Sequence, residues 1–484
     1  MRLRRAITLV LSFALAACAE LPGGGTRAQR LDAASLDGGS ALHAASADAA
    51  WPDTTWWQAY SDAQLDQLVR QALAGNPSLR VAQARVDQAQ GLAAIARSGT
   101  LPQVDGEAGL TRTYYTHEEL TPSFTQANTF WNNEVLLKAS YDLDLWGKNR
   151  NSLDAALDSV HAGEVEVRAA QLSLATAVVQ GYVQLSAQYA LRDVAQANLE
   201  RQRKILDIAR RRYKAGLGTQ LEVNQATTVL PESQAQIEGI DETIALQRNQ
   251  LAALAGKGPG DGEKIARPTL TLAHAAQIPA ALPAGLVGHR PDVVAQRWRV
   301  EAAAKDIEVA KARFYPDVNL VAFGGLDTLS FNQLFTSNAL TGGFGPAISL
   351  PIFEGGKLRG NLRARSAGYD IAVESYNSAV IGALREVADQ VISLRSLARQ
   401  LERTDAALAS AQTADNQAEQ GFRAGLTDYL SVLNTQAELL VQQRNRAQIV
   451  ARQLQAYAAL MKALGGGFEE PAQARTAKGG QVQP

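Results

Sequence analysis

The sequence predicts an α+β membrane protein made of two copies of one unit, in which long helices flank a few short strands. Three observations predict it: an internal repeat, runs of residues that alternate between apolar and polar, and long segments without proline. With 20% charged and 46% hydrophobic residues, the composition excludes a disordered chain. The formal net charge of −1 gives no electrostatic basis for binding nucleic acid.

Three phrases occur twice, in the same order. Asn76-Pro77 to Leu101-Pro102 aligns without gaps on Arg290-Pro291 to Tyr315-Pro316. YDLDLWGKNR (141–150) corresponds to SLPIFEGGKLR (349–359), and RYKAGLGTQLEVNQAT (212–227) corresponds to GFRAGLTDYLSVLNTQ (421–436). This order indicates a duplicated unit, with a first repeat at 61–258, a linker at 259–284 and a second repeat at 285–466.

Each repeat has the same expected plan: a helix, a pair of strands, a very long helix and a shorter helix. The long helices lack proline and carry apolar residues at three- and four-residue steps. The serine-, threonine- and asparagine-rich stretches 116–129 and 327–341 between paired strands are expected to be exposed loops. In chain order, the expected elements are helices at about 62–98, 151–213 and 219–256 around a strand pair at 103–145, then helices at about 292–313, 360–422 and 427–464 around a strand pair at 317–353.

The strands have one apolar and one polar face. In 103–113 the residues Val104, Gly106, Ala108 and Leu110 alternate with polar ones, and 134–145 follows the same period of two. Four short strands cannot close on themselves, so several copies of the chain must pool their strands to cover the apolar face. After the N-terminal segment, no uninterrupted apolar stretch approaches the 20 residues of a transmembrane helix.

The N-terminus has the pattern of a lipoprotein signal peptide over 1–17. A basic start precedes an apolar run that ends in Leu15-Ala16-Ala17-Cys18, which resembles a lipobox. We expect Cys18, the only cysteine, to carry N-acyl and S-diacylglycerol groups; the alternative is an ordinary signal with an incidental cysteine. Residues 18–60 are expected to form a lipidated tether and an equatorial segment, and 467–484 a flexible tail.

Phrases along most of the chain resemble the outer-membrane factor family of TolC-like channels, specifically its OprM/NodT-type lipoproteins of RND efflux systems. The matching phrases are Trp56-Trp57 with Leu65, Leu68, Val69, Ala72-Leu73 and Asn76; Asp144-Leu145-Trp146-Gly147; His289-Arg290-Pro291-Asp292-Val293; Phe314-Tyr315-Pro316; and Phe353-Glu354-Gly355-Gly356.

The resemblance implies a homotrimer with a 12-stranded transmembrane β-barrel, four strands from each protomer, continuous with a long α-helical barrel in the periplasm. It implies the outer membrane of a Gram-negative bacterium, where outer-membrane lipid surrounds the barrel. The channel would passively conduct small molecules, such as drugs or other toxic compounds, from an inner-membrane RND-type pump and a periplasmic adaptor. A type I protein-secretion duct and a non-conducting scaffold lipoprotein that spans the periplasm are the alternatives.

In the family, the two helix turns with glycine form the periplasmic tip, which the resemblance therefore assigns to adaptor docking. Ordinary turns between antiparallel helices would explain the glycines equally well, but not the repetition of the residues beside them. The docking residues are then Tyr213, Lys214, Gly216, Leu217, Arg423, Gly425 and Leu426.

The resemblance also assigns a periplasmic gate to Leu430, Asn434, Phe422 and Asp428. Leu430 and Asn434 are four residues apart and share a helix face, so three copies of Leu430 would form an apolar constriction. Asn434 and Phe422 depart from the aspartate and tyrosine common in relatives, and Asp428 is the nearest acidic residue. The alternative is that Leu430 is a packed core residue.

No pattern indicates an enzyme. The five histidines show no metal-ligand spacing, and Gly256-Lys257-Gly258-Pro259-Gly260 lacks the pattern of a phosphate-binding loop. We expect no cofactor apart from the lipid on Cys18, and no metal site. With Met1 and Met461 as the only methionines, a chain of soft ligands for Cu(I) is not expected.

Overall fold

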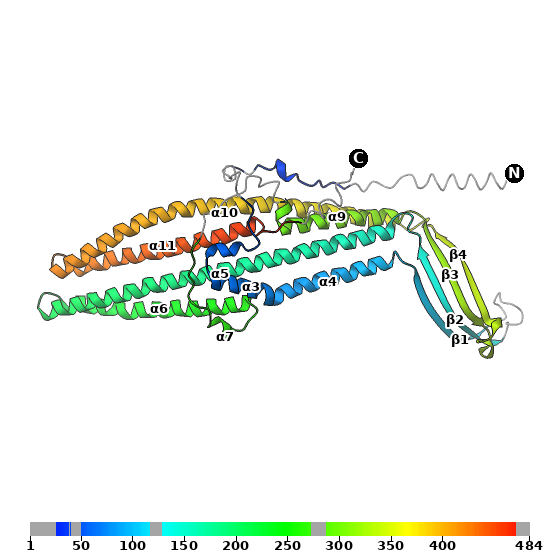
Figure 1. Ribbon diagram of the computed structural model, residues 1–484, viewed down its shortest axis with the longest axis horizontal. Coiled ribbons are helices and arrows are strands. Elements are labelled where there is room, and N and C mark those ends of the chain that lie inside the picture. The colour runs from blue at the N-terminus through cyan, green and yellow to red at the C-terminus, as the bar shows by residue number, and fades with distance from the viewer. Residues whose placement is uncertain (1–25, 38, 40–49, 117–127, 273–286, 471–484) are drawn as a thin grey trace. The chain divides into compact units, whose positions relative to one another are not determined.

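The computed structural model describes residues 26–37, 39, 50–116, 128–272 and 287–470 (Figure 1). They form two compact units. Unit 1 holds the described residues of Met1–Arg30, Ala84–Glu164 and Ala295–Asn377, and unit 2 holds those of Leu31–Gln83, Val165–Val294 and Ser378–Pro484. Cys18 lies outside the described residues.

From α4 onward, the elements of the first repeat occur in the same order as those of the second. The first repeat has α3 (Ala63–Gly75), α4 (Pro77–Ser98), β1 (Gln103–Tyr114), β2 (Thr129–Asp142), α5 (Lys148–Lys214) and α6 (Gln220–Leu254). The second repeat has α9 (Pro291–Ala312), β3 (Asp317–Thr328), β4 (Leu340–Ser349), α10 (Lys357–Ala424) and α11 (Tyr429–Ala463). The short elements are η1 (Ala33–Ser35), η2 (Trp56–Tyr60), α7 (Pro259–Gly262), η3 (Phe331–Gln333) and η4 (Ser337–Ala339).

Corresponding helices have almost equal lengths. Helices α4 and α9 both have 22 residues and begin at a proline, α6 and α11 both have 35, and α5 and α10 have 67 and 68. A proline is well tolerated at the start of a helix, because the first N–H groups have no partner within the helix. The duplication visible in the sequence is therefore also a duplication of helix lengths.

The helix expected at about 62–98 differs from the structure, which has two helices there. Asn76, between α3 and α4, has extended backbone angles (φ −68°, ψ 127°), because a proline disfavours the helical conformation of the residue before it. The Asn76 side chain stabilises this break between the helices. Its Nδ2 donates to the Leu254 carbonyl (2.8 Å), and its Oδ1 accepts from the Ser78 amide (2.8 Å).

The four strands form one antiparallel sheet in the order β1-β2-β3-β4 (Figure 1). The register pairs Val104 with Ala139, Ala139 with Ala322, and Ala322 with Phe344. Because directly opposed residues share a face, most apolar positions of the four strands lie on one side of the sheet, whereas Val321 and Phe323 lie on the other side, opposite Ser140 and Lys138. Many of these side chains are exposed, including Leu137 and Phe344, so one chain leaves an extensive apolar surface uncovered.

The strands end earlier than the expected bounds. Strand β2 stops at Asp142 because the chain turns away through Asp144 (φ 44°) and Gly147 (φ 74°), and β4 stops at Ser349, two residues before Pro351. The expected loop at 327–341 is also more structured, because it contains η3 and η4 and buries Leu334 and Ala339. Of the expected loop at 116–129, residues 117–127 lie outside the described residues.

The core of unit 2 includes residues that the sequence assigned to connecting segments. Trp56, Trp57 and Tyr60, at the end of the expected tether, are buried, and the Tyr60 hydroxyl donates to the Leu454 carbonyl (2.6 Å). The linker is packed up to residue 272: Ile265 is buried, and the Thr269 amide donates to the Asp62 carboxylate.

The Asp62 carboxylate also caps α3 by accepting hydrogen bonds from the Gln64 and Leu65 amides. At the other end of the chain, the described part of the expected tail, 467–470, is packed rather than extended. Glu470 is buried, and its amide donates to the Gly288 carbonyl. The rest of the tail lies outside the described residues.

Among the described residues, no helix combines the length and the apolar character needed to cross a bilayer.

Candidate functional site

The two helix turns named by the sequence have the same backbone structure, and both lie in unit 2. We call Tyr213–Thr219, between α5 and α6, turn A, and Phe422–Asp428, between α10 and α11, turn B. In turn A the Leu217 amide donates to the Arg212 carbonyl (2.9 Å) and the Gly216 amide to the Tyr213 carbonyl (3.0 Å). This pair of bonds is a Schellman motif, in which Gly216 takes the left-handed conformation (φ 72°).

Turn B repeats the motif. The Leu426 amide donates to the Gly421 carbonyl (2.8 Å) and the Gly425 amide to the Phe422 carbonyl (3.2 Å), with Gly425 at φ 76°. A side chain at a positive φ is strained, so both glycines have a backbone role. The repeated glycines of the sequence are therefore explained by helix termination alone, and only the flanking side chains carry information about binding.

The following helices begin with different caps. Thr219 and Glu222 form a reciprocal capping box at the start of α6. At the start of α11 the Asp428 carboxylate accepts from the Ser431 amide (2.9 Å) and the Ser431 hydroxyl (2.5 Å). These two hydrogen bonds from Ser431, the one from its side chain first, lower the pKa of Asp428 below its usual value.

A small apolar core lies beneath the turns. Phe422 is completely buried, and its ring lies against Tyr429 with the ring centroids 5.8 Å apart. Burial raises the pKa of the Tyr429 hydroxyl to about 12. Tyr213 occupies the position of Phe422 in turn A, but its side chain is 46% exposed. The core consists of Ile205, Leu206, Ala226, Phe422, Tyr429 and Val432.

Arg212 connects the two turns, and the sequence did not single it out. One of its terminal nitrogens donates to the Phe422 carbonyl (2.8 Å), and the other donates to the Leu217 carbonyl (3.0 Å). Its guanidinium carbon also lies 4.8 Å from the centroid of the Phe422 ring, within the range of a cation–π contact. The sequence did contain one signal for Arg212: the two repeats differ at this position, where the second repeat has Gly421.

The remaining predicted residues are exposed. Lys214 and Leu217 of turn A and Leu426 of turn B are open to solvent, and Arg423 is exposed while it pairs with Glu419. Leu430 is 61% exposed, and Asn434 is exposed one helical turn further along α11. Within one chain, Leu430 is therefore not a core residue. Phe422 does not join this exposed face, because it lies in the core below it.

Leu221 is the counterpart of Leu430 in the first repeat, and it is 64% exposed. One chain therefore presents two similar exposed leucines, and exposure alone does not distinguish a constriction residue from its copy. This pair supplies a matched control for any experiment on Leu430.

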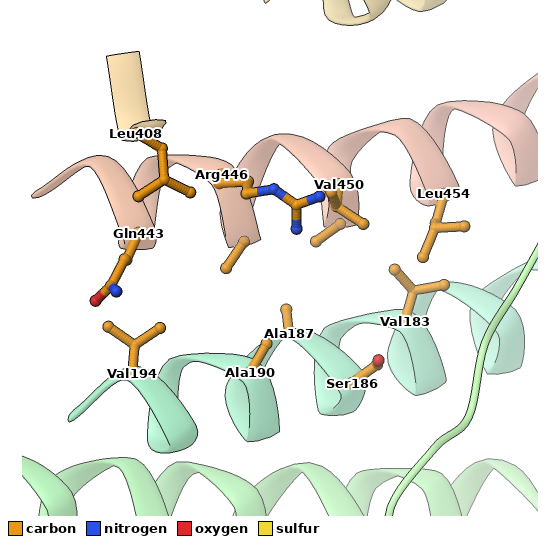
Figure 2. A pocket seen from close by; sticks show the side chains of 12 residues that line it. Val183, Ser186, Ala187, Ala190, Val194, Leu408, Gln443, Arg446, Val450 and Leu454 are labelled. Carbon is orange, nitrogen blue, oxygen red and sulfur yellow. The ribbon is translucent and has the colours of Figure 1, made fainter. Parts of the chain in front are cut away.

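Further along unit 2, an open space lies between helices of the two repeats. A cavity of about 310 Å³ separates α5 from α11, with Val183, Ala187 and Ala190 on one side and Val450 on the other (Figure 2). Arg446 also lines it, and its Nε donates to the Asp405 carboxylate (2.7 Å). Several of the residues that line the cavity, including Val183 and Leu454, are nevertheless buried and belong to the core of unit 2.

In the described part of the chain, no cluster of histidine, cysteine and acidic side chains has an arrangement that could hold a metal ion.

Comparison with known proteins identifies the family. The family model for outer membrane efflux proteins matches residues 68–257 and 282–466. The chain belongs to the outer membrane efflux protein family. The two matched segments correspond closely to the two repeats found in the sequence, and both turns lie within them.

Alignments with three similar proteins each cover most of this chain. The fusaric acid resistance protein FusA of Burkholderia cepacia is 48% identical over 365 residues, which are 74% of this chain and 68% of FusA. The multidrug resistance outer membrane protein MdtP of Escherichia coli K12 is 30% identical over 435 residues, 87% of this chain and 88% of MdtP. The crystal structure of the outer membrane protein VceC from Vibrio cholerae has 38% identity and a TM-score of 0.82, covering 87% of this chain and all of VceC.

Proposed function

We propose that three copies of this outer membrane efflux protein form a passive exit channel for small molecules. Each copy would contribute its four strands to a 12-stranded β-barrel in the outer membrane of a Gram-negative bacterium. The long helices would continue the duct as an α-helical barrel in the periplasm. The exposed apolar face of the sheet is the observation that carries this proposal, because water is a poor solvent for such a surface and lipid is a good one.

The channel would work with an inner-membrane RND-type pump and a periplasmic adaptor, and the pump would supply the energy. The names of FusA and MdtP concern resistance to fusaric acid and to multiple drugs, which supports small-molecule efflux over protein secretion. We assign the channel no catalytic step and no cofactor other than lipid on Cys18. The lipid would give the chain a second attachment to the outer membrane besides its strands.

The adaptor would dock on the exposed residues of the two turns. Leu217 and Leu426 offer apolar contacts, and Lys214 offers positive charge beside Leu217, while Arg423 beside Leu426 is exposed and shares its charge with Glu419. An adaptor surface with apolar pockets and acidic residues would complement this pattern. Six such turns would surround the periplasmic mouth of a trimer.

The gate would consist of three Leu430 side chains with Asn434 beside them and Asp428 at the helix start. An apolar ring blocks ions because water leaves a narrow apolar passage. Phe422 would act indirectly, by packing against Tyr429 and thereby positioning the first turn of α11, which carries Leu430.

Conductance of the purified protein in planar bilayers tests the channel and the gate together. We expect low conductance for the wild type and at least about a tenfold increase for Leu430→Ser or Leu430→Ala, because a smaller or polar side chain keeps the passage wet. Leu221→Ser is the matched control, with the same substitution at the equivalent position of the first repeat, and it should leave the conductance low.

Two other outcomes would contradict parts of this proposal. A protein that never conducts, even with serine at position 430, would be a scaffold and not a channel. Equal opening by Leu221→Ser and Leu430→Ser would contradict the assignment of the gate to the second repeat, while the channel itself would stand.

A further inference from the structure

A cavity of about 520 Å³ lies in unit 1 where helices and strands meet. It is formed by three crossings of the chain: from β2 to α5, from α9 to β3, and from β4 to α10. Three of the phrases that identified the family reach it, through Asp144, Trp146, Tyr315 and Glu354. The candidate site at turns A and B does not explain these phrases, since both turns lie in unit 2 and the phrases lie in unit 1.

Several charged groups of the cavity already have partners. The Lys148 ammonium lies 2.8 Å from the Asp142 carboxylate and 2.7 Å from the Asp317 carboxylate, so the lysine bridges the two carboxylates and offsets one of their two negative charges. The Asp144 carboxylate accepts from the Asn149 and Arg150 amides, both at 2.9 Å, and so caps the start of α5. These groups hold the crossings together and are not free for a ligand.

Two groups of opposite charge remain available. Within the described part of the chain, Arg313 makes no hydrogen bond or ion pair, although it lines the cavity and is exposed. The Glu354 carboxylate forms an ion pair with the Lys357 ammonium at 3.9 Å, a distance too long for a hydrogen bond, so its oxygens can still accept one. The cavity therefore offers an unpaired cation and a carboxylate with free acceptor sites.

The rim of the cavity is aromatic and apolar. The Trp146 ring stacks on Tyr315 with a centroid distance of 4.6 Å, and its indole N–H donates to the Pro316 carbonyl (2.8 Å). Next to Glu354, Ile352 and Phe353 are 92% and 90% exposed. Aromatic rings with a polar N–H or hydroxyl group, and exposed apolar side chains, are both typical of the boundary between a bilayer and water.

We propose that this cavity binds the phosphoethanolamine headgroup of a phospholipid. The Arg313 guanidinium would donate to the phosphate oxygens, and the primary ammonium of the headgroup would donate to the Glu354 carboxylate. The acyl chains would cover Ile352 and Phe353. This inference rests on the proposed function, because that function places the ends of the strands at a membrane surface.

A titration with short-chain lipids tests the headgroup. The probes are dihexanoyl-phosphatidylethanolamine, dihexanoyl-phosphatidylcholine and inorganic phosphate, added to the full-length protein in a neutral detergent and followed by calorimetry. We expect the ethanolamine lipid to bind about tenfold more tightly than the choline lipid, because a trimethylammonium group has no N–H to donate. Inorganic phosphate should not compete, since it has no acyl chains.

Two variants separate the two halves of the headgroup. Arg313→Gln should weaken both lipids by about tenfold, because both contain the phosphate. Glu354→Gln should weaken the ethanolamine lipid to the level of the choline lipid and leave the choline lipid unchanged. Arg363→Gln is the control, since Arg363 is an exposed arginine of α10 outside the cavity, and it should change neither affinity.

Equal affinity for the two lipids would overturn the proposal, as would lipid binding that neither variant changes. Competition by inorganic phosphate would also overturn it, by indicating a site for a free anion. Conductance of the Leu430→Ser variant, prepared in the same way, keeps the two proposals apart, because the wild-type channel is expected to conduct little. A conducting protein without the lipid preference contradicts this inference alone, while a protein with the preference that never conducts contradicts the channel alone.

Discussion

Turns A and B have one backbone and two different sets of side-chain partners. Both end a long helix in a Schellman motif with a glycine at positive φ. Turn A exposes its aromatic residue, Tyr213, whereas turn B buries Phe422 beneath Arg212. The backbone bonds are local and survive duplication unchanged, but the side-chain contacts depend on neighbours that the two copies do not share.

The connection between the turns is consequently one-sided. Arg212 comes from the first repeat and donates to carbonyls of both turns. Gly421, at the equivalent position of the second repeat, has no side chain that could make the corresponding hydrogen bonds. We expect turn B to depend on turn A more than turn A depends on turn B. Hydrogen exchange measured by mass spectrometry reports the opening of each turn separately and so tests this asymmetry.

The largest difference is expected at the paired aromatic positions. Phe422→Ala removes a fully buried ring and should lower the free energy of opening of the amides at 429–433 by about 4 kcal/mol. Tyr213→Ala removes a half-exposed ring and should cost about 0.5 kcal/mol at turn A. Similar losses of opening free energy at the two turns would show that the buried and exposed rings contribute equally. That result would contradict the proposed asymmetry between the turns.

A smaller effect is expected from Arg212. Arg212→Ala removes from turn B one hydrogen bond from a charged donor and a cation–π contact, and should lower the free energy of opening of turn B by about 2 kcal/mol. The neighbouring Arg211 pairs only with Asp207 on the surface in the described structure, so Arg211→Ala is the control, with an expected cost of about 0.3 kcal/mol. If both variants behave alike, Arg212 does not connect the turns.

The smallest effect is expected at the cap of α11, and it depends on pH. The hydrogen bonds from Ser431 lower the pKa of Asp428 in the folded state, so the carboxylate stabilises the cap above its ordinary pKa of about 3.9. This contribution is lost as the pH falls from about 4 through the lowered pKa of the folded state.

The Ser431 amide should therefore lose protection, corrected for its intrinsic exchange rate, over this acidic range. Asp428→Thr gives turn B the cap residue of turn A and should remove this dependence on pH at Ser431. A dependence that persists in the variant would assign the titration to another group.

The apolar periodicity of the sequence, together with the positions of proline and glycine, predicted most helices to within a few residues. The proline-free runs at 151–213 and 360–422 correspond to α5 and α10, since propensity and apolar spacing are local properties. The break at Asn76 was missed, although Pro77 signalled it, because the apolar spacing continues across it. The packed linker was missed because Ile265 and Thr269 have partners in distant segments.

The features of the candidate site also fall into two groups, those that the sequence predicts and those that depend on tertiary contacts. The sequence by itself determined the two turns, because a glycine with repeated neighbours between long helices is sufficient to end one helix and begin another. Only the tertiary structure decided that Phe422 is buried and Tyr213 exposed, and that Arg212 spans both turns. Burial and long-range hydrogen bonds depend on which side chains from remote segments meet, and no local pattern in the chain encodes that meeting.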